Sequence, residues 1–260
     1  MTKKWIVTIT MTLAATLLPV PSFSAENNFD WKEFLGQYDM LWDNDITADP
    51  VFPEGVFGKR HWGRTDGYYS GALMGNGLLG TNLYKLSDGV YRLNVGRSDV
   101  TEVRKPFNVY NSGRLPIGYF TFSTVGKVQD EKMRLSIYDA VTSGGLKTNA
   151  GRLDFRTYVH SERECIIFDT HAEGGETGWK LDFVPQKAIS PRYVFNSANA
   201  PKGYVNAEGK SNPDSYFHKD GDISFSIQAL AKDTTFTDIA RWYVVAWKTV
   251  RNGADSRTIA

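Results

Sequence analysis

The sequence of 260 residues contains a single cysteine, Cys165, so no disulfide can form within the chain. Its four histidines, His61, His160, His171 and His218, lack metal-site spacing, and the chain has neither a G-x-S-x-G nucleophile turn nor a glycine-rich phosphate loop ending in lysine. Basic residues are spread along the chain, and the formal net charge is only +1. The sequence therefore predicts a fold stabilised by its core, with no metal, no cofactor and no nucleic-acid partner.

The first 25 residues have the three parts of a secretory signal. Lys3 and Lys4 precede a mostly apolar run over 5–20, and small residues follow at Ser22 and at Ser24 or Ala25. The run is interrupted by threonines and is short for a bilayer span of about 20 residues, so no membrane insertion is expected. Because no cysteine for a lipid anchor lies near the cleavage site, we expect a periplasmic or secreted product.

Residues 26–67 are predicted to form a lead-in helix followed by a loop. Aromatic and apolar residues between 29 and 42 recur at nearly helical spacing, which predicts a short helix that packs its aromatics on the domain. Asp43, Asn44, Asp45 and Asp49 follow. This acidic cluster lacks the glycine and the trailing glutamate of a helix-loop-helix calcium site, so we interpret it as a solvated turn.

The remaining part, 68–260, has the pattern of an antiparallel β-sandwich. The chain contains 13% aromatic residues and 24 glycines, and short alternating runs recur about every ten residues, which is typical of sandwiches. The clearest pair is a hairpin of 78–84 and 90–95 around an Asp-Gly turn. Further strands are predicted at 116–124, 133–138, 152–160, 164–172 and 179–184, and two adjacent final strands at 223–229 and 241–250. Residues 140–151 are predicted to be a turn, 198–222 a long polar excursion, and the residues after Arg251 a charged tail. Cys165 is expected to be a packed thiol.

A glycine-rich loop, Gly75-Asn76-Gly77 followed by Leu78-Leu79-Gly80, precedes that hairpin. The tripeptide suits either a tight turn or a surface that a ligand approaches closely. Together with Leu93-Asn94-Val95-Gly96-Arg97-Ser98-Asp99, and with the later strand patterns at 134–140 and 151–160, the loop resembles the N-terminal domain of family-95 glycoside hydrolases, which are α-L-fucosidase-like. The resemblance implies a β-sandwich of the super-sandwich type beside a helical (α/α)6 barrel that carries the catalytic groups.

The resemblance places the segment before the loop near the substrate, and aromatic rings can cover the apolar face of a sugar. The candidate substrate-binding residues are Trp62, Tyr68, Tyr69, Asn76, Arg97 and Asp99. Each has a structural alternative. The three aromatics could be hydrophobic packing, Asn76 could belong to a plain turn, and Arg97 and Asp99 could form a structural ion pair.

Three functions stay open at this point. The first is the sandwich domain of a secreted glycoside hydrolase, which ends before the barrel and is inactive alone. Its partners are a glycan and the helical barrel domain. This hypothesis predicts a large exposed apolar patch on one sandwich face. The second is a stand-alone carbohydrate-binding module. The third, an enzyme with its own carboxylate pair, is disfavoured because the acidic residues are scattered and no pair stands out. No catalytic residue is assigned.

Overall fold

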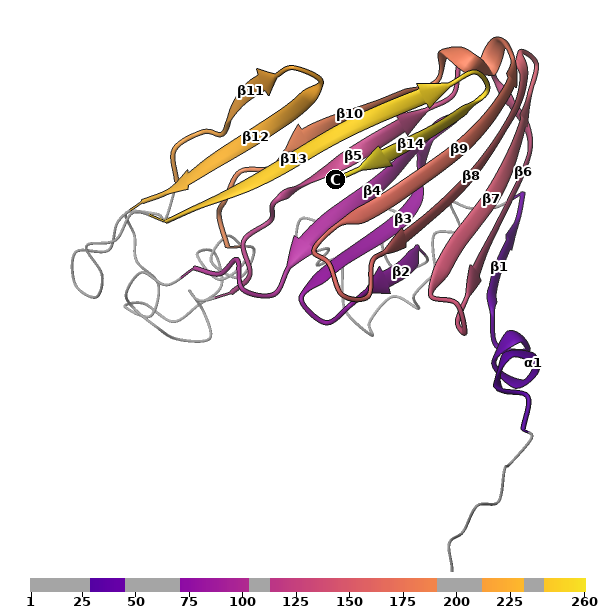
Figure 1. Ribbon diagram of the computed structural model, residues 1–260, viewed down its shortest axis with the longest axis horizontal. Helices are drawn as coiled ribbons and strands as arrows, with labels where there is room; N and C mark the ends of the chain where they lie inside the picture. Colours follow the sequence, from indigo (N-terminus) through magenta and orange to yellow (C-terminus); the bar gives the residue numbers. More distant parts are fainter. Residues whose placement is uncertain (1–28, 45–70, 103–112, 191–211, 232–240) are drawn as a thin grey trace, which may run out of the picture.

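Figure 1 shows the protein as a computed structural model, in which residues 29–44, 71–102, 113–190, 212–231 and 241–260 are described. Two antiparallel sheets and one short α-helix form the described part, so the predicted all-β sandwich with a lead-in helix is confirmed. Helix α1 and strand β1 lie at one end of the molecule, and β11 and β12 lie at the other (Figure 1). The described ranges contain no helix that is long and apolar enough to cross a membrane.

The larger sheet has nine strands in the order β1-β6-β7-β8-β9-β14-β13-β12-β11. Their bounds are β1 Met40–Asp43, β6 Val128–Ser136, β7 Val141–Thr148, β8 Gly151–Val159, β9 Ile166–Gly174, β11 Tyr216–Asp220, β12 Ile223–Leu230, β13 Arg241–Asn252 and β14 Asp255–Ile259. The smaller sheet has five strands in the order β10-β5-β4-β3-β2. Their bounds are β2 Ala72–Gly75, β3 Leu79–Ser87, β4 Val90–Arg97, β5 Gly118–Ser123 and β10 Lys180–Pro185, and a 3-10 turn, η2 Gly175–Gly178, precedes β10.

Hairpins connect most neighbouring strands, as the turn residues predict. Strands β3 and β4 pair through the Asp88-Gly89 turn, where Gly89 has a φ of 67° that favours glycine. The Gly-Asn-Gly loop joins β2 to β3, and Gly77 has a φ of 94°. The adjacent final strands are also confirmed, since β12 and β13 pair over seven residues from Ser224 to Leu230.

The core lies between the two sheets and is rich in aromatic rings. The Phe122 ring lies 5.0 Å from that of Phe168 and 5.6 Å from those of Tyr91 and Trp179, measured between centroids. Phe155 stacks on Phe168 at 6.1 Å. These contacts join β4 and β5 of the smaller sheet to β8 and β9 of the larger one, so burial of large rings stabilises the sandwich in place of disulfides.

The prediction of a turn over 140–151 is wrong, because most of that range is strand β7, between β6 and β8. Its glycines provide space for neighbouring atoms. A Cβ on Gly144 would lie 2.4 Å from Cζ of Phe155 and 2.6 Å from the carbonyl oxygen of Lys132. The glycines that predicted a turn therefore reflect close packing within a sheet, and irregular chain is confined to Ala140 and to residues 149–150 of the range.

The lead-in helix differs from its prediction in length and in packing. Helix α1, Trp31–Gly36, begins at Asp30, whose side chain accepts a hydrogen bond from the backbone of Glu33 at 2.9 Å, and it buries none of its residues. Its aromatics contact one another instead of the domain: the Phe34 ring lies 5.2 Å from that of Phe29 and 5.5 Å from that of Tyr38. The chain then enters β1, so a strand of the larger sheet lies within the range predicted as helix and loop.

Two further strands lie where polar sequence predicted irregular chain. Strand β11 lies within the predicted excursion, and β14 lies in the predicted charged tail, between β9 and β13. The inward positions of β14 are the hydroxyl residues Ser256 and Thr258, which bond to Thr170 at 2.6 Å and to Thr249 at 2.7 Å. Strands whose buried side chains are polar show no hydrophobic alternation.

Candidate functional site

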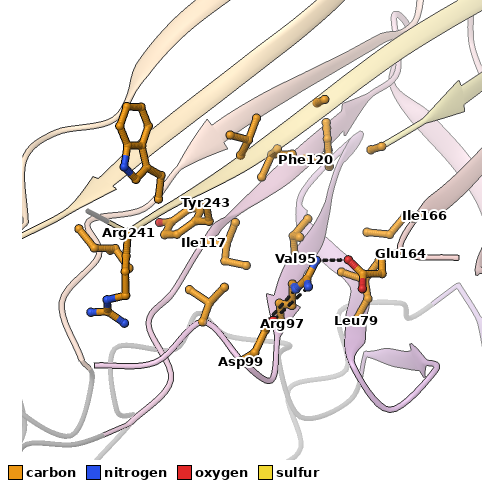
Figure 2. Close-up of a pocket in the computed structure, with 17 residues that line it drawn as sticks. Leu79, Val95, Arg97, Asp99, Ile117, Phe120, Glu164, Ile166, Arg241 and Tyr243 are labelled. Atoms are coloured by element: carbon orange, nitrogen blue, oxygen red, sulfur yellow. Dashed lines mark hydrogen bonds and ion pairs between the residues drawn. The ribbon is translucent and has the colours of Figure 1, made fainter. Parts of the chain in front are cut away.

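A cleft of about 820 Å³ opens between the two sheets. Its size is within the range of small-molecule pockets, and most of its wall is aliphatic. Figure 2 shows Val95, Ile117 and Phe120 of the smaller-sheet side beside Tyr243 and Ile166 of the larger sheet. Charged groups lie at two separate places in its lining: Arg97, Asp99 and Glu164 form one group, and Arg241 stands apart.

The first charged group is centred on Arg97, the last residue of β4. Its guanidinium binds Asp99 at both oxygens, with Nε–Oδ1 at 2.7 Å and Nη2–Oδ2 at 3.0 Å, and it also contacts Glu164, which precedes β9. The hydrogen bond from Arg97 lowers the pKa of Asp99, and the bond to Asp99 raises the pKa of Arg97. The Arg97–Asp99 pair therefore stays charged near neutral pH. With the carboxylate of Glu164 the group has a formal charge of −1, and it joins the two sheets (Figure 2).

Asn76 lies close to this group but is engaged in holding the glycine-rich turn. Its Oδ1 accepts hydrogen bonds from the backbone of Leu78 at 3.1 Å and of Leu79 at 2.9 Å. Its Nδ2 donates to the carbonyl oxygens of His160 at 3.0 Å and Arg163 at 3.3 Å, in the loop between β8 and β9. The amide thus closes the turn and ties it to the other sheet, and a role in substrate binding stays a prediction.

The predicted sugar-stacking residues Trp62, Tyr68 and Tyr69 lie outside the described residues. Of the six predicted positions, Arg97 and Asp99 pair in the lining of the cleft, and Asn76 lies in the turn before β3, outside that lining. Glu164, the second partner of Arg97, was singled out by no motif. Only the folding of β9 next to β4 across the core places it there.

Arg241 and Tyr243 form the second polar region of the cleft. Both lie on the inward face of β13, as Figure 2 shows, and Arg241 is opposite Leu230 of β12. The Tyr243 hydroxyl donates to the carbonyl oxygen of Pro116 at 3.3 Å, and burial raises its pKa to about 12. Arg241 is half-buried as a residue, and within the described part of the chain its guanidinium has no hydrogen bond or ion pair. The sequence pattern had identified this segment only as a strand.

The outer face of β11, β12 and β13 is an exposed apolar surface. Trp242 is 61% exposed and Val244 52%, and the cross-strand register places Ile227 and Tyr216 in the same row as Val244. Tyr216 is 52% exposed. We call these four residues the outer apolar face. A patch of this kind is the feature that the first functional hypothesis predicts.

Two buried carboxylates elsewhere in the described chain, Glu131 and Glu176, have structural partners. Glu176 accepts hydrogen bonds from the backbone of Val125 and Gly126 at 2.9 and 2.8 Å and from the hydroxyl of Thr148 at 2.5 Å. Glu131 binds Lys85 and Tyr91. Among the residues described, no group of three or more histidines, cysteines and acidic residues is placed to hold a metal ion. Cys165 is half-buried.

Comparisons of the chain with known protein families and with curated proteins found no match.

Proposed function

We propose that this chain is the non-catalytic β-sandwich domain of a secreted, glycan-acting protein similar to the family-95 hydrolases. In this role it packs against a helical barrel domain and shapes that domain's glycan pocket. The observation that supports the proposal is the outer apolar face, because a large exposed apolar surface on one sheet is expected where a second domain packs.

The state of the carboxylates supports the view that the chain is inactive alone. A glycosidase needs one carboxylic acid that is protonated at working pH beside a second carboxylate. At the cleft, the hydrogen bonds from Arg97 lower the pKa of Asp99, and the same guanidinium binds Glu164. The lowered pKa keeps the Asp99 carboxyl charged, so Asp99 does not serve as the proton donor. We therefore expect no hydrolysis of fucosides or galactosides by the purified chain.

The docking role can be tested with the barrel region of a family-95 hydrolase supplied as a separate protein. Val244→Lys puts a charge in the centre of the outer apolar face, and Ile137→Lys is a matched control because Ile137 is also exposed, at 42%, but follows β6. We expect calorimetry to show association that Val244→Lys weakens by roughly tenfold or more, whereas the control leaves it unchanged. Hydrolysis by the chain alone, or equal effects of the two variants, would contradict the proposal.

A stand-alone carbohydrate-binding module is the second candidate, and the positions of two exposed aromatics favour it. Trp242 and Tyr216 lie on the same face, two strands apart and offset by two residues, which corresponds to roughly 12 Å between their Cα atoms. Rings at such a spacing can stack on two sugars of one chain. If this function holds, Trp242→Ala abolishes binding on a glycan array, and Val244→Ala, a change on the same face and strand, does not. Loss of binding on Trp62→Ala instead would place the glycan site at the predicted aromatic loop.

A further inference from the structure

The cleft between the sheets has the properties of a small-molecule binding site, and on β13 its lining adjoins the outer apolar face at Trp242 and Val244. Its wall contains aliphatic and aromatic side chains from both sheets, including Val95, Ile117, Phe120 and Leu230. Tyr243 adds the face of its ring, while its hydroxyl is already bonded to a backbone carbonyl. A polar sugar would leave most of its hydroxyls without partners against this wall, so the cleft suits an apolar ligand.

The charges at the cleft are arranged asymmetrically. Arg97 is neutralised by Asp99 and Glu164, and this group has one excess negative charge. Arg241 lies apart from it, with Ile117 and Val95 between them in Figure 2, and has no ion-pair partner in the described chain. An unpaired guanidinium beside an apolar wall favours an anion, and its planar fork binds a carboxylate with two parallel hydrogen bonds.

We propose that the cleft binds an apolar molecule that carries one carboxylate, such as a straight-chain fatty acid, with the carboxylate on Arg241 and the hydrocarbon along Ile117, Phe120 and Leu230. The negative group around Arg97 sets the direction, because it repels the carboxylate from the other side of the cleft. This inference does not depend on the proposed glycan role.

The test is isothermal titration calorimetry with three soluble eight-carbon probes, octanoate, 1-octanol and octylammonium. We expect octanoate to bind with the highest affinity and octylammonium with the lowest. Decanoate should bind roughly tenfold more tightly than octanoate, because each buried methylene contributes about 0.8 kcal/mol. Arg241→Ala should weaken the binding of octanoate by at least about tenfold, because its charge-assisted hydrogen bonds to the carboxylate are lost, and should leave the binding of 1-octanol unchanged.

Three further variants locate the site. Ala260 packs inward against the core and lines the cleft, so Ala260→Trp should fill the space and block both octanoate and 1-octanol; circular dichroism checks its fold. Arg156→Ala removes an exposed arginine of β8, and Ile137→Lys changes an exposed apolar residue that follows β6. Neither residue lines the cleft, so both variants should bind octanoate as the natural chain does. Absence of saturable binding, equal affinity for octanoate and 1-octanol, or an unchanged affinity of Arg241→Ala would overturn the proposal.

Discussion

Replacing Lys85 by methionine should destabilise the fold strongly, because it leaves a buried carboxylate without its cation. Lys85 of β3 binds Glu131 of β6 at 2.9 Å, and their side chains are 15% and 4% exposed. Tyr91 of β4 donates to the other carboxylate oxygen at 2.6 Å. The three residues thus join the smaller sheet to the larger one through a nearly dry contact.

The magnitude follows from this burial. Removing one partner of a buried ion pair typically costs 3–5 kcal/mol, and the partial exposure of Lys85 argues for the lower end, about 3 kcal/mol for Lys85→Met. Glu131→Gln removes the charge but keeps an oxygen that can accept the hydrogen bond from Tyr91. The double variant, with both Lys85→Met and Glu131→Gln, should therefore lose less stability than Lys85→Met alone. The cost of the double variant should then differ from the sum of the two single costs by a coupling energy of about 1–3 kcal/mol.

The assay is urea unfolding followed by tryptophan fluorescence for the natural chain, both single variants and the double variant. Lys132→Met is the matched control, since Lys132 is the next residue along β6 and its ion pair with Asp43, at 3.8 Å, has side chains that are 65% and 69% exposed. Its cost should stay within about 0.5 kcal/mol. A cost below about 1 kcal/mol for Lys85→Met, or strictly additive effects, would refute the reasoning.

Three other changes test the fold. Burial, together with the bond to Glu131, raises the pKa of Tyr91, so its protonated form adds stability that is fully present below about pH 10 and declines above it by about 1.4 kcal/mol per pH unit. Urea titrations between pH 9 and 11 should show that the unfolding free energy of Tyr91→Phe declines less steeply than that of the natural chain. An identical decline would contradict this assignment. Asn76→Ala should cost about 1–3 kcal/mol in the same assay, because two backbone N–H groups of the turn and two carbonyls of the facing loop lose their partner; a cost near zero would mean that water replaces the amide. Gly144→Ala should cost about 1–3 kcal/mol and lower the melting temperature, because its methyl would overlap the Phe155 ring, and unchanged melting would show that the ring moves aside.

Much of the fold could be predicted from the sequence, because half-buried strands alternate and glycine marks tight turns. The β3–β4 hairpin and the adjacent final strands were predicted for these reasons and are confirmed. The predictions failed where the local signal pointed elsewhere. The glycines of β7 make room for Phe155, and the inward side of β14 consists of Ser256 and Thr258, whose hydroxyls find partners only on neighbouring strands.

The candidate site was less predictable than the fold. Arg97 and Asp99 are two residues apart on an extended chain, so their ion pair was one of the interpretations that the sequence left open, and it is present. Glu164 is 67 residues from Arg97, and Arg241 is farther still along the chain. No local pattern relates such residues, because their proximity depends on how the sheets pack.

Local chemistry alone therefore determined the all-β class, the main hairpins and the turn at Gly75-Asn76-Gly77. Strand period and backbone conformation depend on residues close in sequence, which is why these features can be recognised there. Tertiary structure decided the strand order, the charge balance of the cleft and the exposure of the outer apolar face. These three features depend on contacts between distant strands. The alternation of apolar and polar residues along a strand does not show whether an apolar side chain such as Trp242 is covered by another element or lies at the surface.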